Sequence, residues 1–332
     1  MKKLYPLKFK PILKDKIWGG DKLKLILNKN YAPLPNCGES WEISGVQDNI
    51  SVVSNGFLAD NNLEEIIEVY MGDLVGDKVY DLFGMKFPLL IKFIDANDQL
   101  SIQVHPDDEL AFKRHKGFGK TEMWYIINAD NNAELISGFN KDVNKKEYIN
   151  HLNQNTLKEI LNIEKVSSGN VFFIPSGRVH AICKGIVLAE IQQTSDVTYR
   201  IYDWDRIDTN GKKRDLHTEL ALDAIDFKYY SDYKTKYFKK LNESSTLINC
   251  KYFTTNILEF NQTIEKDYNN IDSFIILMCI EGEYLIKYDN KEKPVKAYKG
   301  ETILLPACIK YFELKPLTQT KLLEIYISGI KK

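Results

Sequence analysis

The stretch that decides the fold is GNVFFIPSGRVHAI, residues 169–182. A glycine opens a short apolar strand, Pro-Ser-Gly forms a turn, and His180 follows on the next strand. The same pattern returns without gaps at residues 300–313, GETILLPACIKYFE, where Tyr311 stands opposite His180. The chain is therefore expected to contain one β-unit twice, and the fold does not require the histidine.

The repeat extends upstream of this stretch. The segment TEMWYIIN, residues 121–128, aligns with DSFIILMC, residues 272–279, and places Glu122 opposite Ser273. The first copy is longer between its aligned segments, by about the length of a helical segment at 144–163. In this alignment the polar side chains that could act in a site, Glu122 and His180, occur only in the first copy. The functional site is therefore expected in the first copy.

Short apolar runs dominate the rest of the chain. Eight of them are bounded by Gly, Pro, Asn or Asp: FPLLIKFI, LSIQVH, MWYIIN, NVFFIP, IVLAEIQQ, FIILMCI, EYLIKY and ETILLP. Many short strands at this spacing predict a mainly β fold, an antiparallel sandwich or barrel. Apolar residues at helical spacing predict three helical insertions, at about 62–84, 144–163 and 215–227, the last with Asp215 as its N-cap.

The length of 332 residues suggests about two domains, because a domain typically has roughly 100–200 residues. A charged, tyrosine-rich stretch between about 228 and 248 has no clear apolar period, and it is expected to lead into the second domain. We predict a catalytic domain over 1–240 that contains the helical insertions. A degenerate second domain without metal ligands, over 249–332, is expected to pack against the first and cover it.

Composition narrows the class of partner. The net charge is −1 and the pI about 6.6, so no global field draws the chain toward nucleic acid or an anionic membrane, and a small-molecule partner is expected. The first residues, MKKLYPLKFKPILKDK, lack the apolar core of a signal peptide, and the run FIILMCI is far shorter than the ~20 residues of a membrane span. Five scattered cysteines without a CxxC pair predict a reducing, cytoplasmic location. The sequence leaves the oligomeric state open.

Four polar residues on three predicted strands form a candidate metal site. Gln103 and His105 are two positions apart, so on a strand they point to the same face. Glu122 begins a second strand and His180 lies on a third. Two imidazoles, one carboxylate and one amide oxygen make a mixed nitrogen and oxygen set that suits Zn²⁺ and leaves a coordination position for water or substrate.

These residues carry a family resemblance. The spacing from Gly169 through Pro175 and Gly177 to His180 matches the second cupin motif up to its last position, where Lys184 replaces the usual asparagine. The first cupin motif is looser, with Gln-Val-His in place of His-x-His and a late glutamate. Together with five further segments, the chain resembles type I mannose-6-phosphate isomerases of the short bacterial form: IQVHPDDELA, GKTEMWYI, AEIQQTSDVTYRIYDWDR, IWGG and GESWEIS.

The resemblance implies two cupin-like jelly-roll units with helical insertions. It also implies a zinc-dependent enzyme that interconverts mannose 6-phosphate and fructose 6-phosphate. Carried over by motif, the zinc ligands are Gln103, His105, Glu122 and His180, and Arg200 is an active-site residue.

The implied reaction assigns roles to further residues. An aldose–ketose isomerisation passes through an enediolate, whose negative charge a Lewis acid stabilises without a nicotinamide; no GxGxxG fingerprint is visible in the sequence. The resemblance makes Glu190 the candidate base, and a partly desolvated pocket is expected to raise its pKa toward neutrality. Arg200 and Arg206, six positions apart, and Lys120, two before Glu122, are candidates for holding the substrate phosphate.

Two other readings stay open from sequence. One is a metal-containing cupin that binds a sugar phosphate as a sensor without turning it over. The other is a cupin isomerase or oxygenase with iron and a different substrate. Metal analysis would distinguish an iron oxygenase from the zinc isomerase, and a panel of substrates would exclude a different sugar.

Overall fold

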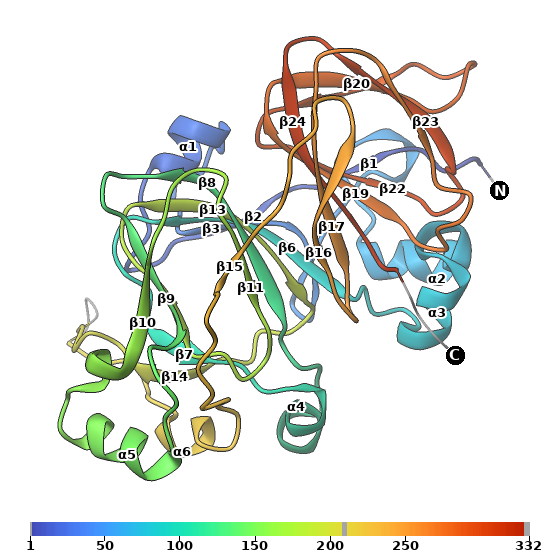
Figure 1. Ribbon diagram of the computed structural model, residues 1–332. Helices are drawn as coiled ribbons and strands as arrows, with labels where there is room; N and C mark the ends of the chain where they lie inside the picture. Colours follow the sequence, from blue (N-terminus) through green and yellow to red (C-terminus); the bar gives the residue numbers. More distant parts are fainter. Residues whose placement is uncertain (1, 208–210, 329–332) are drawn as a thin grey trace.

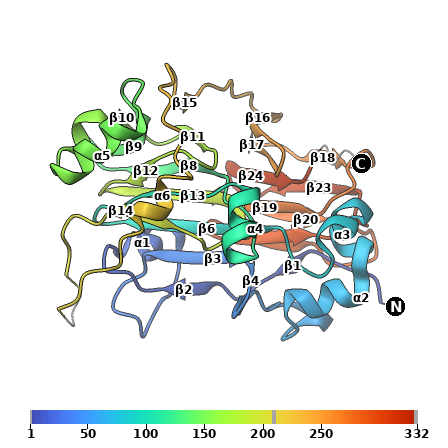
Figure 2. The same ribbon diagram turned by 90° about the horizontal axis from the view of Figure 1, so that it is seen from below.

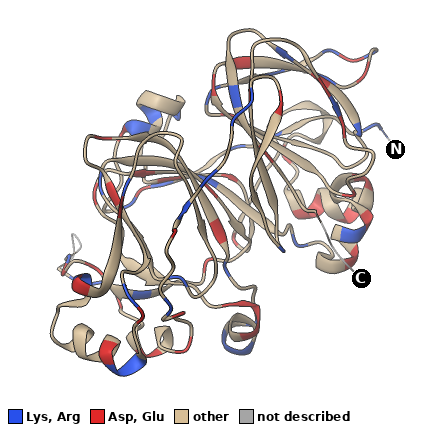
Figure 3. Ribbon diagram, in the orientation of Figure 1, with Lys and Arg blue, Asp and Glu red and all other residues tan. Residues whose placement is uncertain are grey.

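The computed structural model describes residues 2–207 and 211–328, which form two adjoining lobes of β structure (Figure 1). Each lobe is built from two β sheets, and the helices lie at the periphery. Lys and Arg, and Asp and Glu, are scattered over both lobes, in keeping with the near-zero net charge (Figure 3). Each of the eight apolar runs contains a strand, so the predicted mainly β fold is confirmed.

The first lobe, called the first unit below, contains a seven-stranded and a five-stranded sheet. The seven-stranded sheet has the order β15-β11-β8-β13-β6-β3-β2, and the five-stranded sheet has the order β10-β9-β12-β7-β14. The strands are β2 (Ile12–Lys14), β3 (Glu39–Ile43), β6 (Leu89–Ala96), β7 (Ile102–Val104), β8 (Glu122–Ala129), β9 (Glu134–Phe139), β10 (Leu161–Lys165), β11 (Val171–Ile174), β12 (His180–Ile182), β13 (Ile186–Gln193), β14 (Tyr199–Tyr202) and β15 (Lys234–Thr235).

The second lobe, called the second unit, repeats this arrangement with a six-stranded sheet, β1-β22-β19-β24-β17-β16, and a four-stranded sheet, β18-β23-β20-β21. Strand β1 comes from the start of the chain, so the N-terminal segment completes a sheet of the second unit. The strands are β1 (Leu7–Lys8), β16 (Ser244–Asn249), β17 (Thr254–Phe260), β18 (Ile264–Asp267), β19 (Ile275–Glu281), β20 (Glu283–Lys287), β21 (Val295–Tyr298), β22 (Thr302–Leu305), β23 (Tyr311–Pro316) and β24 (Thr320–Tyr326). A small pair, β4 (Gly45–Val46) and β5 (Asn49–Ile50), lies outside these sheets.

The larger sheets of the two units share one apolar core. Met123 and Ile191 of the first unit belong to the same buried cluster as Ile276 and Ile325 of the second. The opposite faces of these sheets bury separate clusters inside each unit. Strand β13 is consequently buried at all eight positions, the polar Glu190, Gln192 and Gln193 included.

The predicted insertion at 62–84 is confirmed as two helices, α2 (Leu63–Val75) and α3 (Asp77–Phe83). Asn62 and Glu65 form a capping box at the start of α2, and Gly76 separates the helices with a φ of +96° that favours glycine. Both helices lie beside the second unit, where the carbonyl oxygen of Leu74 accepts a hydrogen bond from the amide of Ala307.

The other two predicted helices are shorter than expected. Only α5 (Lys145–Asn153) and the 3₁₀ turn η2 (Leu157–Ile160) form at 144–163, because the segment ends in β10, which pairs with β9. Region 215–227 contains only α6 (Thr218–Ala221). The prediction that Asp215 is its N-cap is wrong, since His217 occupies that position and the Asp215 carbonyl oxygen accepts from Arg200 instead.

Three helical elements were not anticipated: α1 (Lys22–Leu27), the 3₁₀ turn η1 (Gly56–Leu58) and α4 (Asp108–His115). The side chain of Asp107 caps α4 by accepting from the amide of Leu110. Helix α4 lies near the junction of the two lobes (Figure 2). Its short charged sequence buries only Ala111, so it lacks the apolar periodicity from which the other helices were predicted.

Strand register corrects the sequence alignment of the two units. Glu122 pairs with Ile174, and Ile275 pairs with Leu305, the counterpart of Ile174; Glu122 therefore corresponds to Ile275 rather than to Ser273.

The alignment is also wrong by one residue after the turn. Tyr311 is 48% exposed, whereas Phe312 is buried inside the second unit as His180 is buried inside the first. Because side chains alternate along a strand, a slip of one residue moves a position to the other face.

Candidate metal centre and active site

Two histidines and one glutamate from three strands meet inside the first unit. His105 follows β7, Glu122 begins β8 and His180 begins β12. Nε2 of His105 lies 3.5 Å from Oε2 of Glu122, and Nε2 of His180 lies 3.4 Å from Oε1 of the same carboxylate. All three side chains are buried, and their candidate donor atoms lie within 4.8 Å of one another. One ion can therefore contact all three.

The other ring nitrogen of each histidine faces a backbone carbonyl. Nδ1 of His105 is 3.1 Å from the oxygen of Val197, and Nδ1 of His180 is 2.8 Å from the oxygen of Arg178. A carbonyl oxygen only accepts, so each Nδ1 carries the proton and each Nε2 directs a lone pair toward Glu122. This is the arrangement in which histidine binds a metal.

The cluster has unsatisfied polar atoms. Nε2 of His105 and both carboxylate oxygens of Glu122 are buried without a hydrogen-bond partner. An unsatisfied buried polar group costs on the order of 1–3 kcal/mol, so proteins seldom keep several together. A divalent cation would satisfy them all, and the donor set of imidazole nitrogens and carboxylate oxygens fits such an ion.

The ionisation of the cluster also fits a cation. Burial lowers the pKa of His180 to about 4 and that of His105 well below its usual value, so both rings are neutral ligands at pH 7. Burial, with the nearby Glu190 carboxylate, raises the pKa of Glu122 to about 8. A bound cation would favour the ionised carboxylate and reverse that shift.

Gln103 and Arg200 lie in one row with His180 across the five-stranded sheet. In the register, Gln103 pairs with His180 on one side and with Arg200 on the other. The amide nitrogen of Gln103 is 3.3 Å from Nε2 of His180, so this side chain reaches the cluster. Arg200 is half-buried, its Nη1 donates to the Asp215 carbonyl oxygen at 2.8 Å, and its Nε has no partner.

Glu190 lies on the inner face of the seven-stranded sheet in a buried ion pair. Nζ of Lys92 is 2.8 Å from Oε1 of Glu190, and Nε1 of Trp124 donates to Oε2 at 3.0 Å. Burial alone would raise the pKa of Glu190, but Lys92 and Lys120 together with these hydrogen bonds bring it below its usual value. The expectation of a raised pKa is therefore wrong, because the sequence did not reveal the lysine partner.

Lys120 is 6% exposed, and its Nζ lies 3.6 Å from Oε2 of Glu122. It is thus a buried cation beside the metal cluster and not a surface ion pair. The structure brings it together with Lys92, so two ammonium groups face two carboxylates in this interior.

Arg206 has several protein partners. Its guanidinium donates to Asp203 at 2.7 Å and to the Gln99 carbonyl oxygen at 2.6 Å. Arg214, which the sequence did not single out, also contacts Asp203. Positive charge therefore gathers near Arg200, whose pKa is lowered by burial and then by Arg214.

The chain matches two models of known families. Residues 6–121 match the catalytic domain of phosphomannose isomerase type I, and residues 243–326 match the cupin domain of mannose-6-phosphate isomerase. Mannose-6-phosphate isomerase ManA of Bacillus subtilis is 37% identical over 317 residues, which cover 93% of this chain and 96% of that protein. The chain belongs to the type I mannose-6-phosphate isomerase family. A Streptococcus mutans mannose-6-phosphate isomerase is 32% identical over 93% of this chain and 94% of that protein.

Solved structures of family members share the fold. The crystal structure of the Bacillus subtilis mannose 6-phosphate isomerase has a TM-score of 0.86 at 34% identity, and the match covers 96% of this chain and 99% of that one. A phosphomannose isomerase from Salmonella typhimurium, at 16% identity, has a TM-score of 0.79 over 98% of this chain and all of that one, which shows the same fold. The predicted pair of cupin-like units is confirmed, as open pairs of sheets. No helix among residues 2–207 and 211–328 has the length and apolarity to span a membrane.

Sequence reasoning did not single out Lys92, the buried partner of Glu190. A lysine inside the apolar run FPLLIKFI was the available signal, because a charge on a strand buried at every position needs a partner. Its Nζ contacts Glu190 and, at 2.8 Å, Oε1 of Gln192. The strand pattern gave no indication of which carboxylate it would meet.

Proposed function

We propose that this chain is a zinc-dependent aldose–ketose isomerase that interconverts mannose 6-phosphate and fructose 6-phosphate through an enediolate. The observation that carries the proposal is the buried cluster of His105, Glu122 and His180. Its donor atoms converge, and Nε2 of His105 and both oxygens of Glu122 have no hydrogen-bond partner. The relatives' names support the substrate. Gln103 is the proposed fourth ligand, because its side chain reaches His180.

In this proposal the bound zinc supplies a Lewis acid, which stabilises negative charge developing on a substrate oxygen. Glu190 is the proton-transfer base, since its lowered pKa keeps the carboxylate ionised and able to accept a proton at pH 7. Lys92 and Trp124 each hold one oxygen of that carboxylate and so fix its orientation.

Lys120 and Arg200 supply the positive charge that an anionic substrate requires. Lys120 lies beside the metal ligand Glu122, and Arg200 lies beside Gln103 in the sheet register. We assign Arg206 a weaker part in binding the phosphate, because Asp203 and Gln99 already engage it.

We further propose that residues 1–240 act as the catalytic domain and 249–332 as a cupin domain without metal ligands. The proposed cluster lies wholly within the first of these ranges. We infer a cytoplasmic location, supported by five cysteines that form no disulfide.

The test is conversion of mannose 6-phosphate to fructose 6-phosphate by the purified protein, before and after chelation, with zinc added back. Activity that disappears with the metal and returns with zinc is the expected result. Retained zinc with tight sugar-phosphate binding and no turnover would contradict the isomerase and favour a sensor. Activity that follows iron instead of zinc would contradict the assigned metal.

A further inference from the structure

The segment that carries Lys120 and Glu122 is held at Thr121, the residue between them. The amide of Thr121 donates to Oε1 of Gln193 at 2.9 Å, and the amide of Gln193 donates to the Thr121 carbonyl oxygen at 3.2 Å. Both residues are buried. Gln193, at the end of β13, therefore fixes the backbone from which the lysine and the glutamate project.

Gln193 is oriented in turn by Asp108, the first residue of α4. Nε2 of Gln193 donates to Oδ1 of Asp108 at 3.0 Å, and the amide of Gly119 donates to the same oxygen at 3.2 Å. The backbones are so close here that a Cβ on Gly119 would lie 2.5 Å from the Asp108 nitrogen. One carboxylate oxygen thus contacts both the side chain that holds Thr121 and the backbone two residues before it.

The second oxygen of Asp108 faces the second unit. Oδ2 accepts from the hydroxyl of Tyr252 at 2.7 Å and from Nζ of Lys251 at 3.2 Å. Both residues lie between β16 and β17. Burial alone would raise the pKa of Asp108, but the donors Tyr252, Gln193 and Lys251 lower it, so the carboxylate is ionised and these hydrogen bonds are charge-assisted.

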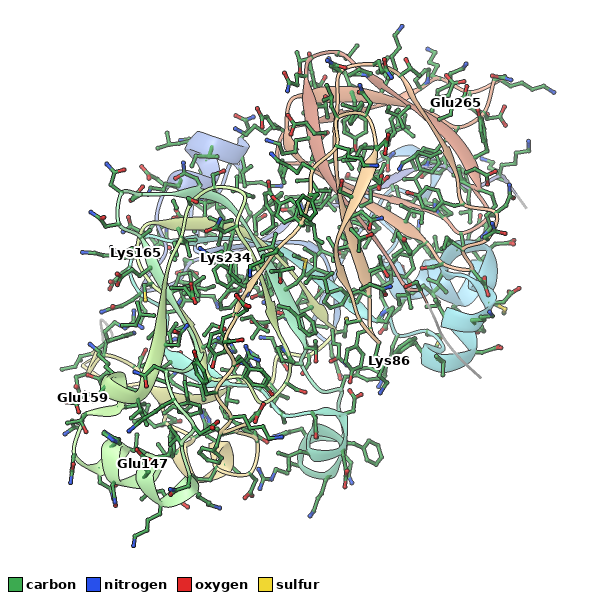
Figure 4. The ribbon with its side chains drawn as sticks, in the orientation of Figure 1. Lys86, Glu147, Glu159, Lys165, Lys234 and Glu265 are labelled. Carbon is green, nitrogen blue, oxygen red and sulfur yellow. The ribbon has the colours of Figure 1, made fainter. Side chains whose placement is uncertain are left out.

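A cavity of about 1990 Å³ borders this contact and is lined by residues of both units, among them Asp108, Gln193 and Tyr252. Lys86, another lining residue, lies at the junction of the lobes (Figure 4). The Lys251 side chain is 77% exposed, so its ion pair with Asp108 is weakened by solvent. The half-buried Tyr252 is the stronger of the two links.

We propose that Tyr252 is a positioning residue for the isomerase, acting on Lys120 and Glu122 through Asp108, Gln193 and Thr121. The second unit then contributes to catalysis without supplying a group that touches metal or substrate. The inference deepens the proposed function and rests on it, although the hydrogen-bond chain also predicts an effect on metal binding that needs no turnover.

The experiment compares Tyr252→Phe with Tyr268→Phe. Both tyrosines lie in the second unit, and each change removes one hydroxyl that donates to a carboxylate. The acceptor of Tyr252 is Asp108 of the first unit, whereas the acceptor of Tyr268 is Glu324, inside the second unit and outside the proposed series of hydrogen bonds. For each variant we would measure kcat and KM, the zinc affinity of the metal-free chain against a chromophoric chelator, and the unfolding temperature.

Tyr252→Phe is expected to lower kcat on the order of tenfold and zinc affinity severalfold, because positions near a metal ligand are sensitive to small displacements. Tyr268→Phe is expected to leave kcat and zinc affinity unchanged. Equal effects from both variants, or no effect of Tyr252→Phe, would overturn the proposal. If the wild-type protein does not turn over mannose 6-phosphate, the proposed function fails. The zinc affinities of Tyr252→Phe, Tyr268→Phe and the wild-type protein still show whether Tyr252 positions the metal ligand.

A double-mutant cycle with Gln193→Met tests whether Tyr252 acts through Gln193 or through a general destabilisation of the contact between the two units. If Tyr252 acts through Gln193, the double variant loses little more kcat and zinc affinity than Gln193→Met alone. Independent, additive losses would contradict the proposed route. Lys251→Ala, which removes the exposed link, is expected to change both quantities less than Tyr252→Phe does.

Discussion

The interiors of the two units compare position by position, because their strands have matching registers. In the first unit Glu190 lies in a row with Lys92 and Trp124; in the second unit Glu324 lies in the equivalent row with Asn256 and Leu277. The second copy therefore keeps a buried glutamate, and the expectation that polar side chains occur only in the first copy is wrong.

The two glutamates differ in how their charge is balanced. Glu324 is fully buried, lies 2.5 Å from Nζ of Lys266 and accepts from the hydroxyls of Tyr268 and Ser244. Lys266 pairs with Phe312 as Gln103 pairs with His180, so an ammonium group occupies the strand position of a proposed metal ligand.

The second unit thus balances its buried glutamate with a protein cation and two hydroxyl donors. The first unit instead brings donor atoms of His105, Glu122 and His180 within 4.8 Å of one another, and three of these atoms lack a hydrogen-bond partner. The same framework supports either a filled core or a reactive site, and a few side chains decide which.

The largest contrast is expected between His180→Ala and its counterpart Phe312→Leu. Loss of one imidazole from the cluster should abolish zinc retention and lower turnover by at least about a thousandfold, since the Lewis acid is lost. Phe312→Leu should keep zinc and turnover and cost about 1 kcal/mol of folding free energy. Zinc content per chain, turnover and denaturant unfolding check both. A His180→Ala protein that retains zinc and activity would break the assignment of the centre.

Substitution of the two buried glutamates is expected to affect different quantities, kcat for Glu190 and stability for Glu324. Glu190→Gln is expected to lower kcat by about 10²–10⁴-fold, the usual contribution of a general base. Glu324→Gln is expected to leave kcat unchanged and to lower the free energy of unfolding by about 3 kcal/mol, because it leaves Lys266 without its carboxylate partner. Kinetics and chemical denaturation distinguish the two. A stable but inactive Glu324→Gln enzyme would show that the second interior takes part in catalysis.

Stability of the metal-free chain should depend on pH through Glu122. Its pKa of about 8 lies above the unfolded value, so between about pH 6.5 and 8 the folded state binds more protons and stability falls as pH rises. The unfolding free energy should drop by roughly 1–2 kcal/mol over this range. His180, with a folded-state pKa of about 4, is neutral in the folded protein throughout the window. Its opposing contribution comes from protonation of the unfolded chain near pH 6.5 and below.

The control for this pH dependence is Glu122→Gln, which should remove the slope, as should saturation with zinc. The second unit has Ile275 at the equivalent position and therefore no group that titrates there. A slope that persists in Glu122→Gln would assign the proton to another residue.

The smallest effect is expected for Tyr311→Phe. Tyr311 is 48% exposed and points away from the second interior, so the loss of its hydroxyl should change turnover by less than about twofold. Steady-state kinetics is sufficient to test this. A folded but inactive Tyr311→Phe enzyme would refute the view that this strand is remote from catalysis.

Several features followed from the sequence alone. The eight apolar runs are strands because alternating and continuous apolar patterns report which faces are buried. The spacing of Gln103 and His105, and the positions of Glu122 and His180 at strand beginnings, predicted that these residues meet, and in the structure they do. Apolar periodicity predicted the strands and the cupin motif predicted the cluster, because both patterns are formed by residues near one another in the sequence.

Other features depended on tertiary structure. The partner of Glu190 is Lys92, 98 positions away, and Tyr252 reaches Asp108 across 144 positions. Such pairs are fixed by the register of strands and by the docking of one unit on the other. A one-residue slip in register turns a side chain to the opposite face, as Phe312 and Tyr311 show. The sequence thus predicted many of the strands and the residues of the candidate metal cluster, while packing decided which charges neutralise each other and how the two units contact.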